Sequence, residues 1–360
     1  MLPLFKDWRK KYLSDPQMII LALMLILGFG IVFFLGKILM PVFASLVIAY
    51  LLEGLVTHLQ RWKIPRLAAV VIVFLSFIAG LFVLFIWFFP MLSRQISQFI
   101  QQLPAMLVQG QKQLMQLPER YPDFISAAQI QQIFDTISAN LTVVAKRLLS
   151  WSLASVMGIF TLVVYLILVP FLVFFFLKDK ARILTWVRKL LPDNLDLTTT
   201  VWFEVNKQLA NYIRGKGWEI LIVWVISYIV FKVLGMEYTL LLSFFIGLSV
   251  ILPYIGVTVM FLPVAMIAYF QWGWGGYMVY ALIAYAAIQI VDGNILAPLL
   301  LSGVIDLHPT AIIISVLMFG GLWGIWGVFF AIPLATLVNT LIKTWLLRLE
   351  TDAGEKGQES

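Results

Sequence analysis

The sequence predicts an all-α polytopic membrane protein, and three observations support this fold class. Of the 360 residues, 62% are hydrophobic and only 12% are charged, whereas soluble domains are roughly half apolar and a quarter charged. Several apolar runs exceed the roughly 18 residues that indicate a membrane-spanning helix. Glycine and proline interrupt some of the later runs, which predicts broken or re-entrant segments. We expect about eight transmembrane helices.

The composition also excludes several kinds of protein. There are no cysteines and only two histidines, His58 and His308, which excludes disulfides, thiolate metal sites and a histidine-rich metal centre. No phosphate-binding loop, zinc-protease motif or serine-hydrolase motif occurs, so we expect neither an enzyme nor a cofactor. The basic residues that give the net charge of +7 lie in loops beside apolar runs, where they set membrane orientation. We therefore reject nucleic acid as a partner and expect a lipid bilayer.

Residues 1–93 are predicted to form three transmembrane helices. The first apolar run follows a basic start and lacks a small-residue cleavage site, so we expect it to be a retained span. Lys37 and Pro41 predict a narrow turn between the first two spans. The three spans are expected at about 18–36, 38–57 and 67–92.

Residues 94–150 are predicted to form an amphipathic helical hairpin outside the bilayer. Apolar residues recur there at helical spacing on both sides of a turn signal, LPERYPD at 117–123. Packing of the hairpin on itself or on a neighbouring subunit is one role. Lying on the membrane or binding a partner is the other.

The second half begins with a fourth span at 151–177 and a basic segment at 178–217. A C-terminal bundle of apolar helices follows at 218–347, and a polar tail closes the chain at 348–360. Within the bundle, a fifth span is expected at 218–234, before long apolar stretches near 238–270, 277–300 and 308–347. The basic segment contains Lys178, Lys180, Arg182, Arg188, Lys189, Lys207, Arg214 and Lys216.

The basic residues predict the orientation. The amino terminus, the 58–66 loop and the 178–217 segment are all basic and fall on one side if each run spans once. That side is expected to be cytoplasmic. Both termini are then cytoplasmic and the hairpin is external, whether the later stretches span or re-enter.

Two apolar stretches of the bundle are too long for one straight span and carry breaks. PYIG at 253–256 interrupts the first, and GGLWGIWG at 320–327 together with Pro333 interrupts the last. Broken, paired apolar segments indicate the binding site of a transporter. Alternatively, the glycines only allow close helix packing. The candidate residues here are Pro253, Tyr254, Gly256, Gly320, Gly321 and Gly324.

The stretch IQIVDGNILAPLL at 288–300 places an acid within apolar sequence. Asp292 at mid-bilayer would cost at least about 2.5 kcal/mol, which makes it a candidate for ion or proton binding. Gln289 and Asn294 are expected to share hydrogen bonds with Asp292 or with a solute. In the alternative, Asp292 lies in the headgroup region and caps the helix near Pro298.

Two further titratable residues are weaker candidates. His308 could relay protons, or it could simply begin the next helix from a loop. Glu53 lies at the end of the second span. It is a candidate functional acid, or it pairs with Arg61 or with water.

An ordered set of motifs resembles a known family. The motifs are FFFLKDK (174–180), YIRGK (212–216), LPYIG (252–256), VDGNILAP (291–298), LHP (307–309) and FGGLWGIWGVFFAIPLA (319–335). Together they resemble the autoinducer-2 exporter family of bacterial membrane proteins, over nearly the whole chain. The resemblance implies about eight spans, a bacterial inner-membrane location, homo-oligomers with a pentamer as one form, and export of a small sugar-like signal. Other members of the family are described as sodium–proton antiporters, so the resemblance implies antiport as another possible activity.

We therefore expect a transporter that exports a small polar solute, with proton or sodium coupling at Asp292 as a hypothesis. A monovalent cation–proton antiporter is the second hypothesis. A membrane scaffold for envelope or division proteins, acting through 94–150 or 178–217, is the third. A passive oligomeric pore also remains open.

Overall fold

The computed structural model describes residues 16–115, parts of 126–139, and residues 156–189, 196–301 and 307–339. Its regular structure in these residues is helical and contains no strand, which confirms the all-α fold. The basic amino terminus, the 117–123 turn and the 348–360 tail lie outside the described residues. Four described helices are long and apolar enough to cross a membrane: Ile38–Arg61, Arg66–Lys112, Ile255–Trp272 and Gly276–Leu300. Shorter apolar helices accompany them.

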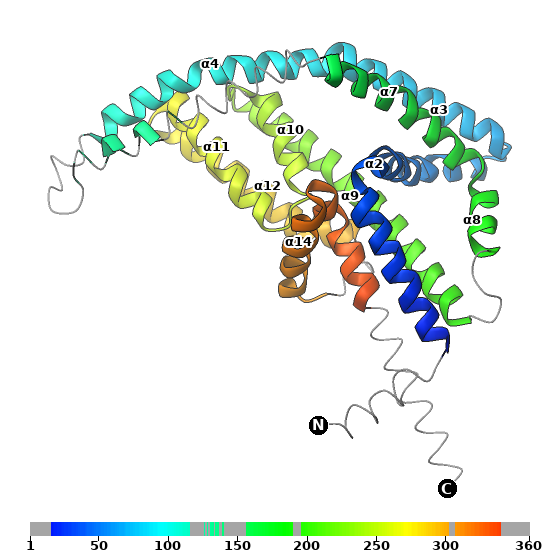
Figure 1. The fold of residues 1–360 in the computed structure, drawn as a ribbon. Helices are drawn as coiled ribbons and strands as arrows, with labels where there is room; N and C mark the ends of the chain where they lie inside the picture. The colour runs from blue at the N-terminus through cyan, green and yellow to red at the C-terminus, as the bar shows by residue number, and fades with distance from the viewer. Residues whose placement is uncertain are drawn as a thin grey trace, which may run out of the picture.

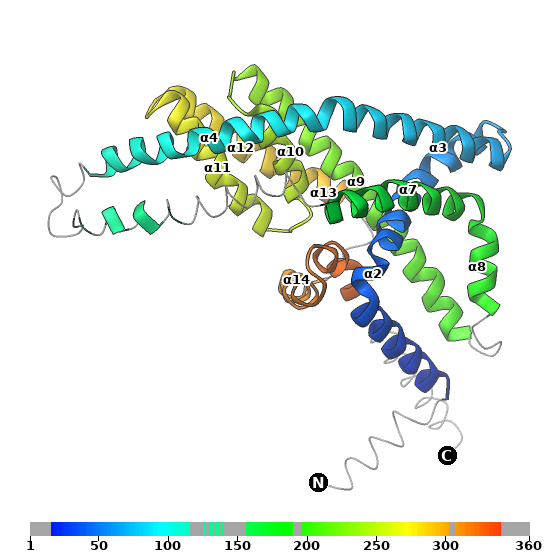
Figure 2. The same cartoon turned by 45° about the horizontal axis from the view of Figure 1, so that its top comes forward.

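The first described helix, α2 (Pro16–Arg61), is continuous through Lys37 and Pro41, so the expected narrow turn is wrong. Proline inside a helix removes one backbone hydrogen bond and kinks the helix. Figures 1 and 2 show that the two halves of α2 run in different directions. Ser45 Oγ donates to the Pro41 carbonyl oxygen at 2.6 Å, which supplies a side-chain donor one turn after the proline.

Helices α3 (Arg66–Val83) and α4 (Phe89–Leu114) are joined by a π-helical turn, η1 (Leu84–Phe88), into one long rod. The apolar helix Arg66–Lys112 contains 47 residues. At 1.5 Å per residue this is about 70 Å, against about 30 Å for the hydrocarbon core of a bilayer. The predicted end of the third span near residue 92 is therefore not a helix end. The first arm of the 94–150 segment continues that span (Figure 1).

The two arms of the 94–150 segment touch in the part that is described. Gln111 Nε2 donates to Gln131 Oε1 at 2.7 Å. A Cβ built on Gly110 would lie in van der Waals contact with the Phe134 ring.

Two π-helical turns occur in the described residues, and each ends two residues before a proline. The first is η1, which precedes Pro90; the second is η2 (Asp292–Leu296), which precedes Pro298. In each turn, the amide of the following residue donates to the carbonyl oxygen five residues earlier. Phe89 donates to Leu84, and Ala297 donates to Asp292. A proline ring clashes with the carbonyl four residues earlier, and a wider turn relieves this clash. The second turn begins at the candidate acid.

Helix α7 (Val156–Lys178) packs against α2 and α3, and their contact contains the fully buried Val56, Val70 and Val173. A short basic helix, α8 (Lys180–Lys189), follows. Helix α9 (Asp196–Val233) then runs without interruption from the basic segment into the apolar bundle. The predicted start of the fifth span at residue 218 is thus an interior position of a helix.

The predicted breaks in the bundle are confirmed at two places. Helices α10 (Thr239–Ser249) and α11 (Ile255–Trp272) are separated by a turn in which Tyr254 has φ +63°. Helix α14 (Pro309–Trp323) and the helix Ile325–Asn339 are separated by Gly324 at φ +61°. Pro333 lies inside this last helix, so the expected interruption there is wrong.

Helix α12 (Gly276–Val291) continues through η2 into the short α13 (Ala297–Leu300). In both views α12 runs beside α11 (Figures 1 and 2). Buried side chains of α9, α10, α11 and α12 form one hydrophobic core, which includes Val223, Tyr285 and Ile288. The end of α12 is therefore held against the middle of α9.

Candidate functional site

Two glycines bring α9 close to its neighbours on either side of Lys216. A Cβ on Gly215 would lie 2.5 Å from the Leu300 carbonyl oxygen at the end of α13. A Cβ on Gly217 would lie 2.5 Å from Leu51 Cδ2 on α2. Only glycine permits such approaches without displacing a neighbour. Lys216 is consequently enclosed and only 4% exposed.

Lys216 forms a buried ion pair with Glu219, one turn further along α9. Lys216 Nζ lies 3.0 Å from Glu219 Oε1 and 2.9 Å from Oε2. Residues three apart lie on the same face of a helix, and this face is buried at both positions. Removing such a pair of charges from water costs several kcal/mol per ion, which only close pairing and further contacts offset. The pair is therefore an expensive feature for a helix of this bundle.

Asp292 opens the π-helical turn η2 and is 6% exposed. Its Oδ1 atom is buried and has no hydrogen-bond partner among the described residues. The Nε2 atom of Gln289, one turn earlier, is also buried and unpartnered there. Buried polar atoms without partners are rare and point to a role beyond stability.

The three charged residues lie on elements that pack together. Lys216 and Glu219 are paired on α9, and α9 packs against η2, the turn that Asp292 begins. Between residues 239 and 301, Asp292 is the only charged side chain in the sequence. With all three groups ionised, the cluster carries one uncompensated negative charge in an apolar surrounding, which is costly. A single proton or monovalent cation would neutralise it. We call Lys216, Glu219 and Asp292 the charged triad.

The amides expected to join Asp292 do not bond to it. Asn294 is exposed, and its Nδ2 atom donates to the Ile290 carbonyl oxygen of its own helix at 2.9 Å. The Gln289 side-chain nitrogen is buried and has no partner among the described residues. The expected helix cap is also absent, because η2 continues into α13 and Asp292 makes no capping hydrogen bond.

The candidate residues at the two breaks form tight turns rather than part of the charged triad. Pro253 and Tyr254 lie in the turn between α10 and α11, where a Cβ on Gly256 would lie 2.0 Å from the Ser249 carbonyl oxygen. Gly320 and Gly321 lie in the last turn of α14, and Gly324 ends that helix. No hydrogen bond joins either turn to the triad in the described part of the chain.

His308 is exposed at the amino end of α14. Its Nδ1 atom accepts a hydrogen bond from the Thr310 amide at 3.3 Å, as an N-cap residue does. The geometry therefore places it where the helix begins.

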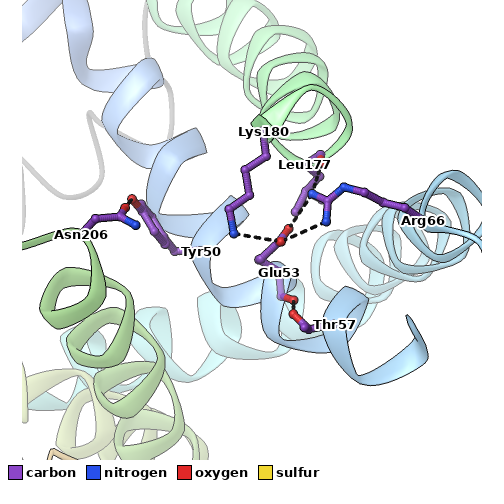
Figure 3. Close-up of polar contacts among 7 residues, drawn as sticks. All are labelled: Tyr50, Glu53, Thr57, Arg66, Leu177, Lys180 and Asn206. Atoms are coloured by element: carbon purple, nitrogen blue, oxygen red, sulfur yellow. Dashed lines mark hydrogen bonds and ion pairs between the residues drawn. The ribbon is translucent and has the colours of Figure 1, made fainter. Parts of the chain in front are cut away.

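Glu53 pairs with partners other than the expected Arg61. Its carboxylate lies 3.3 Å from Arg66 and 2.9 Å from Lys180, and Arg66 also donates to the Leu177 carbonyl oxygen at 2.8 Å. Figure 3 shows these contacts converging on Glu53 from α2, α3 and the start of α8. The cluster ties three helices together, so Glu53 has a structural explanation.

Two residues of the triad were not predicted from the sequence. Lys216 is one of eight basic residues in a polar segment, and Glu219 does not stand out there. The signal that could have found them is the i, i+3 spacing of a base and an acid at the entrance to an apolar run.

Two surface grooves in the described residues lie away from the triad. One, of about 620 Å³, is lined by residues of 128–139, and the other, of about 520 Å³, by residues of 86–98. A search of the described residues found no group of three His, Cys, Asp or Glu side chains able to hold a metal ion.

Comparison with known proteins identifies the chain's relatives. The family model described as "AI-2E family transporter" matches residues 19–347. A protein of Escherichia coli (strain K12) named as the permease PerM is 41% identical, over 96% of this chain and 98% of its own length. A Bacillus subtilis (strain 168) protein named as the transport protein YueF is 25% identical, over 85% and 84%. The helical chain matches this family over nearly its whole length, and it therefore belongs to the AI-2E transporter family.

Proposed function

We propose that the protein exports a small polar solute across the bacterial inner membrane, driven by a proton or sodium gradient, with Asp292 as the ion-responsive acid. The family is one of transporters and permeases. The observation that supports coupling is the buried, unpartnered Oδ1 atom of Asp292 beside the Lys216–Glu219 pair. Ionisable groups inside membrane segments mark ion pathways and proton relays.

In this proposal, the binding of a proton or cation at Asp292 removes the uncompensated charge of the triad. That change alters the free-energy balance between two arrangements of the bundle, because a buried unpaired charge is costly in one of them. The breaks at Tyr254 and Gly324 are the places where the bundle helices can change direction. Movement there would expose the solute to one side and then the other.

The proposed orientation, with both termini cytoplasmic, is supported by the Glu53 cluster. Arg66 ends the basic 58–66 loop, and Lys180 lies in the basic 178–217 segment. Both contact the same carboxylate, so the two basic regions meet at one end of the helices. Labelling single cysteines at exposed Lys63 and Lys189 in intact cells tests this, since neither should react until the inner membrane is opened.

The test of the function is flux into proteoliposomes that contain a pH-sensitive dye. Wild type, Asp292→Asn and the matched control Glu237→Gln, an exposed acid outside the bundle core, are compared under imposed proton and sodium gradients. Autoinducer-2 is the organic probe. Coupled transport predicts that the probe and the ion move together in wild type and in the control, and that Asp292→Asn loses this link. Coupled flux that persists in Asp292→Asn would overturn the assignment of Asp292.

Monovalent cation–proton antiport is the second candidate function. It is favoured by the charge of the triad, which one proton or one monovalent cation balances without any organic solute. The same vesicles distinguish the two functions. Antiport predicts that a sodium gradient alone changes the internal pH and that autoinducer-2 has no effect.

A scaffold role is favoured by one observation, the length of the Arg66–Lys112 helix, which exceeds a bilayer. Removing residues 94–150 separates this role from transport. If the protein is a scaffold, the deletion abolishes the cellular phenotype and leaves solute flux intact. If the segment serves transport, flux is lost as well.

A further inference from the structure

The charged triad contains two carboxyl groups but only one ammonium group, and the ammonium group is bound to one of them. Lys216 Nζ contacts both oxygens of Glu219 within 3.0 Å. Asp292, on the neighbouring turn η2, has a buried oxygen without a partner among the described residues. The described structure is therefore one of two possible pairings of a single cation with two acids.

The helix packing brings the two acids and the lysine into one region. Lys216 and Glu219 are buried on α9, and α9 packs against η2 and α12. The neighbouring Gly215 lies against the Leu300 carbonyl group, so the backbones of α9 and α13 approach closely next to Lys216. A lysine side chain has four methylene groups and a freely rotating ammonium group. Its charged end can therefore change partners while its backbone stays in place.

We propose that Lys216 is a tethered counter-ion that alternates between Glu219 and Asp292 during the transport cycle. This inference rests on the proposed function, in which Asp292 is the ion-responsive acid, and it adds Lys216 and Glu219 as its positioning and relay residues.

The exchange conserves charge and protons. We assign the described pairing to a state in which Glu219 is a carboxylate bound to Lys216 and Asp292 holds one proton. Asp292 then releases its proton to water on one side of the membrane, and Lys216 Nζ leaves Glu219 and pairs with the new Asp292 carboxylate. Glu219 takes up one proton from water on the other side. Each state contains one ammonium group, one carboxylate and one neutral carboxyl group. The buried charge is zero before and after, which avoids the cost of an isolated ion.

The other titratable groups near the triad have partners of their own. The Tyr212 hydroxyl of α9 donates to the Phe329 carbonyl oxygen, and the Tyr285 hydroxyl of α12 donates to the Val257 carbonyl oxygen. Arg214 bonds to Ala210 and Asn211 of its own helix.

In the described part of the chain, no ion pair joins another helix to the triad. On α2, Glu53 is bound to Arg66 and Lys180. Helices α10, α11, α13 and α14 contain no acidic or basic side chain, and the exposed His308 stands before α14. The two pairings hold equal numbers of protons, so the pH dependence of gradient-driven flux reports protonation of the triad as a whole.

The first test is the pH profile of gradient-driven flux in Lys216→Met, Lys216→Arg and the control Lys232→Met. Lys232 is an exposed lysine on the same helix. Loss of the cation removes the charge that favours the carboxylate form, an effect of about 1–3 pH units for a close opposite charge. The midpoint of the profile should move upward by that amount in Lys216→Met. It should stay in place in Lys216→Arg and Lys232→Met. An unshifted midpoint in Lys216→Met would overturn the inference.

A second measurement does not depend on transport. Infrared difference spectra of the reconstituted full-length protein, taken at one pH before and after a proton gradient is imposed, report the C=O band of a protonated carboxyl group. Wild type should show a band that Asp292→Asn removes and a second band that Glu219→Gln removes, with one band growing as the other falls. If coupled flux exists but the two bands change independently, Lys216 exchange is wrong and the proposed function stands. If the bands exchange but no coupled flux occurs, the proposed function fails and the exchange stands.

Folding of the variants is checked with Lys216→Met/Glu219→Gln. Removing one partner of a buried pair is more destabilising than removing the charge of both. The double variant should therefore unfold at a higher temperature than Lys216→Met alone. A double variant less stable than the single variant would contradict the pairing itself.

Discussion

Gly215 lies so close to Leu300 that a Cβ on residue 215 would be 2.5 Å from the Leu300 carbonyl oxygen. This approach fixes α9 against α13, and it sets the position of the adjacent Lys216. On the opposite side, Gly217 faces only the methyl end of the Leu51 side chain, also at 2.5 Å. The two glycines flank the same lysine but differ in what they touch, backbone in one case and a flexible side chain in the other.

Gly215→Ala is expected to destabilise the protein by about 1–3 kcal/mol, the usual cost of overpacking a rigid site. Gly217→Ala is expected to cost less, because Leu51 can rotate away. Tryptophan fluorescence during thermal unfolding in detergent measures both variants. Equal or greater loss in Gly217→Ala would show that the contact between α9 and α13 is not the rigid one.

Gly327→Ala tests the close packing at the second break. Its Cβ would lie 1.8 Å from the Phe319 carbonyl oxygen, whereas a Cβ on Gly321 meets nothing within 4 Å. We expect Gly327→Ala to lower the unfolding temperature and reduce flux. Gly321→Ala should be neutral or gain up to about 1 kcal/mol, as alanine does over glycine in a helix. A neutral Gly327→Ala would contradict the packing of α14 against the following helix.

His308→Ala distinguishes a helix cap from a proton relay. Loss of the bond from the Thr310 amide is expected to cost about 0.5–2 kcal/mol of stability, the range for N-cap residues. The pH profile of flux should remain that of wild type. A displaced profile with unchanged stability would instead assign the histidine to the proton path.

Glu53→Gln tests the cluster that joins α2, α3 and α8. Arg66 and Lys180 are each more than a third exposed, so each pair is expected to contribute only about 0.2–1 kcal/mol. The loss should shrink at high salt, because salt screens exposed charges. Unfolding at low and high salt, with Glu237→Gln as the control, measures this. Complete loss of flux with unchanged stability would make Glu53 functional rather than structural.

The helical fold and the two breaks could be predicted from the sequence, because apolar length and backbone conformation are local properties. Gly324 adopts a positive φ, which a glycine at that position allows without strain. Pro333 shows the limit of the same reasoning. It lies inside a helix, since membrane helices tolerate a proline whose freed carbonyl group finds another partner.

The triad could be predicted only in part. Asp292 stands out as an acid within apolar sequence, and in the structure it is buried. Hydropathy, however, places a boundary near residue 218, between Lys216 and Glu219, and so separates two residues that α9 joins within one turn. Their approach to Asp292 depends on the packing of α9 against η2, which no local pattern encodes.

The most direct test of coupling at Asp292 compares two movements of autoinducer-2 in the same proteoliposomes. One is exchange between equal concentrations without an ion gradient, and the other is movement driven by an imposed proton or sodium gradient. We predict that Asp292→Asn retains exchange and loses gradient-driven movement, while Glu237→Gln keeps both. If Asp292→Asn moves the probe along the ion gradient as well as wild type does, Asp292 is not the ion-responsive acid.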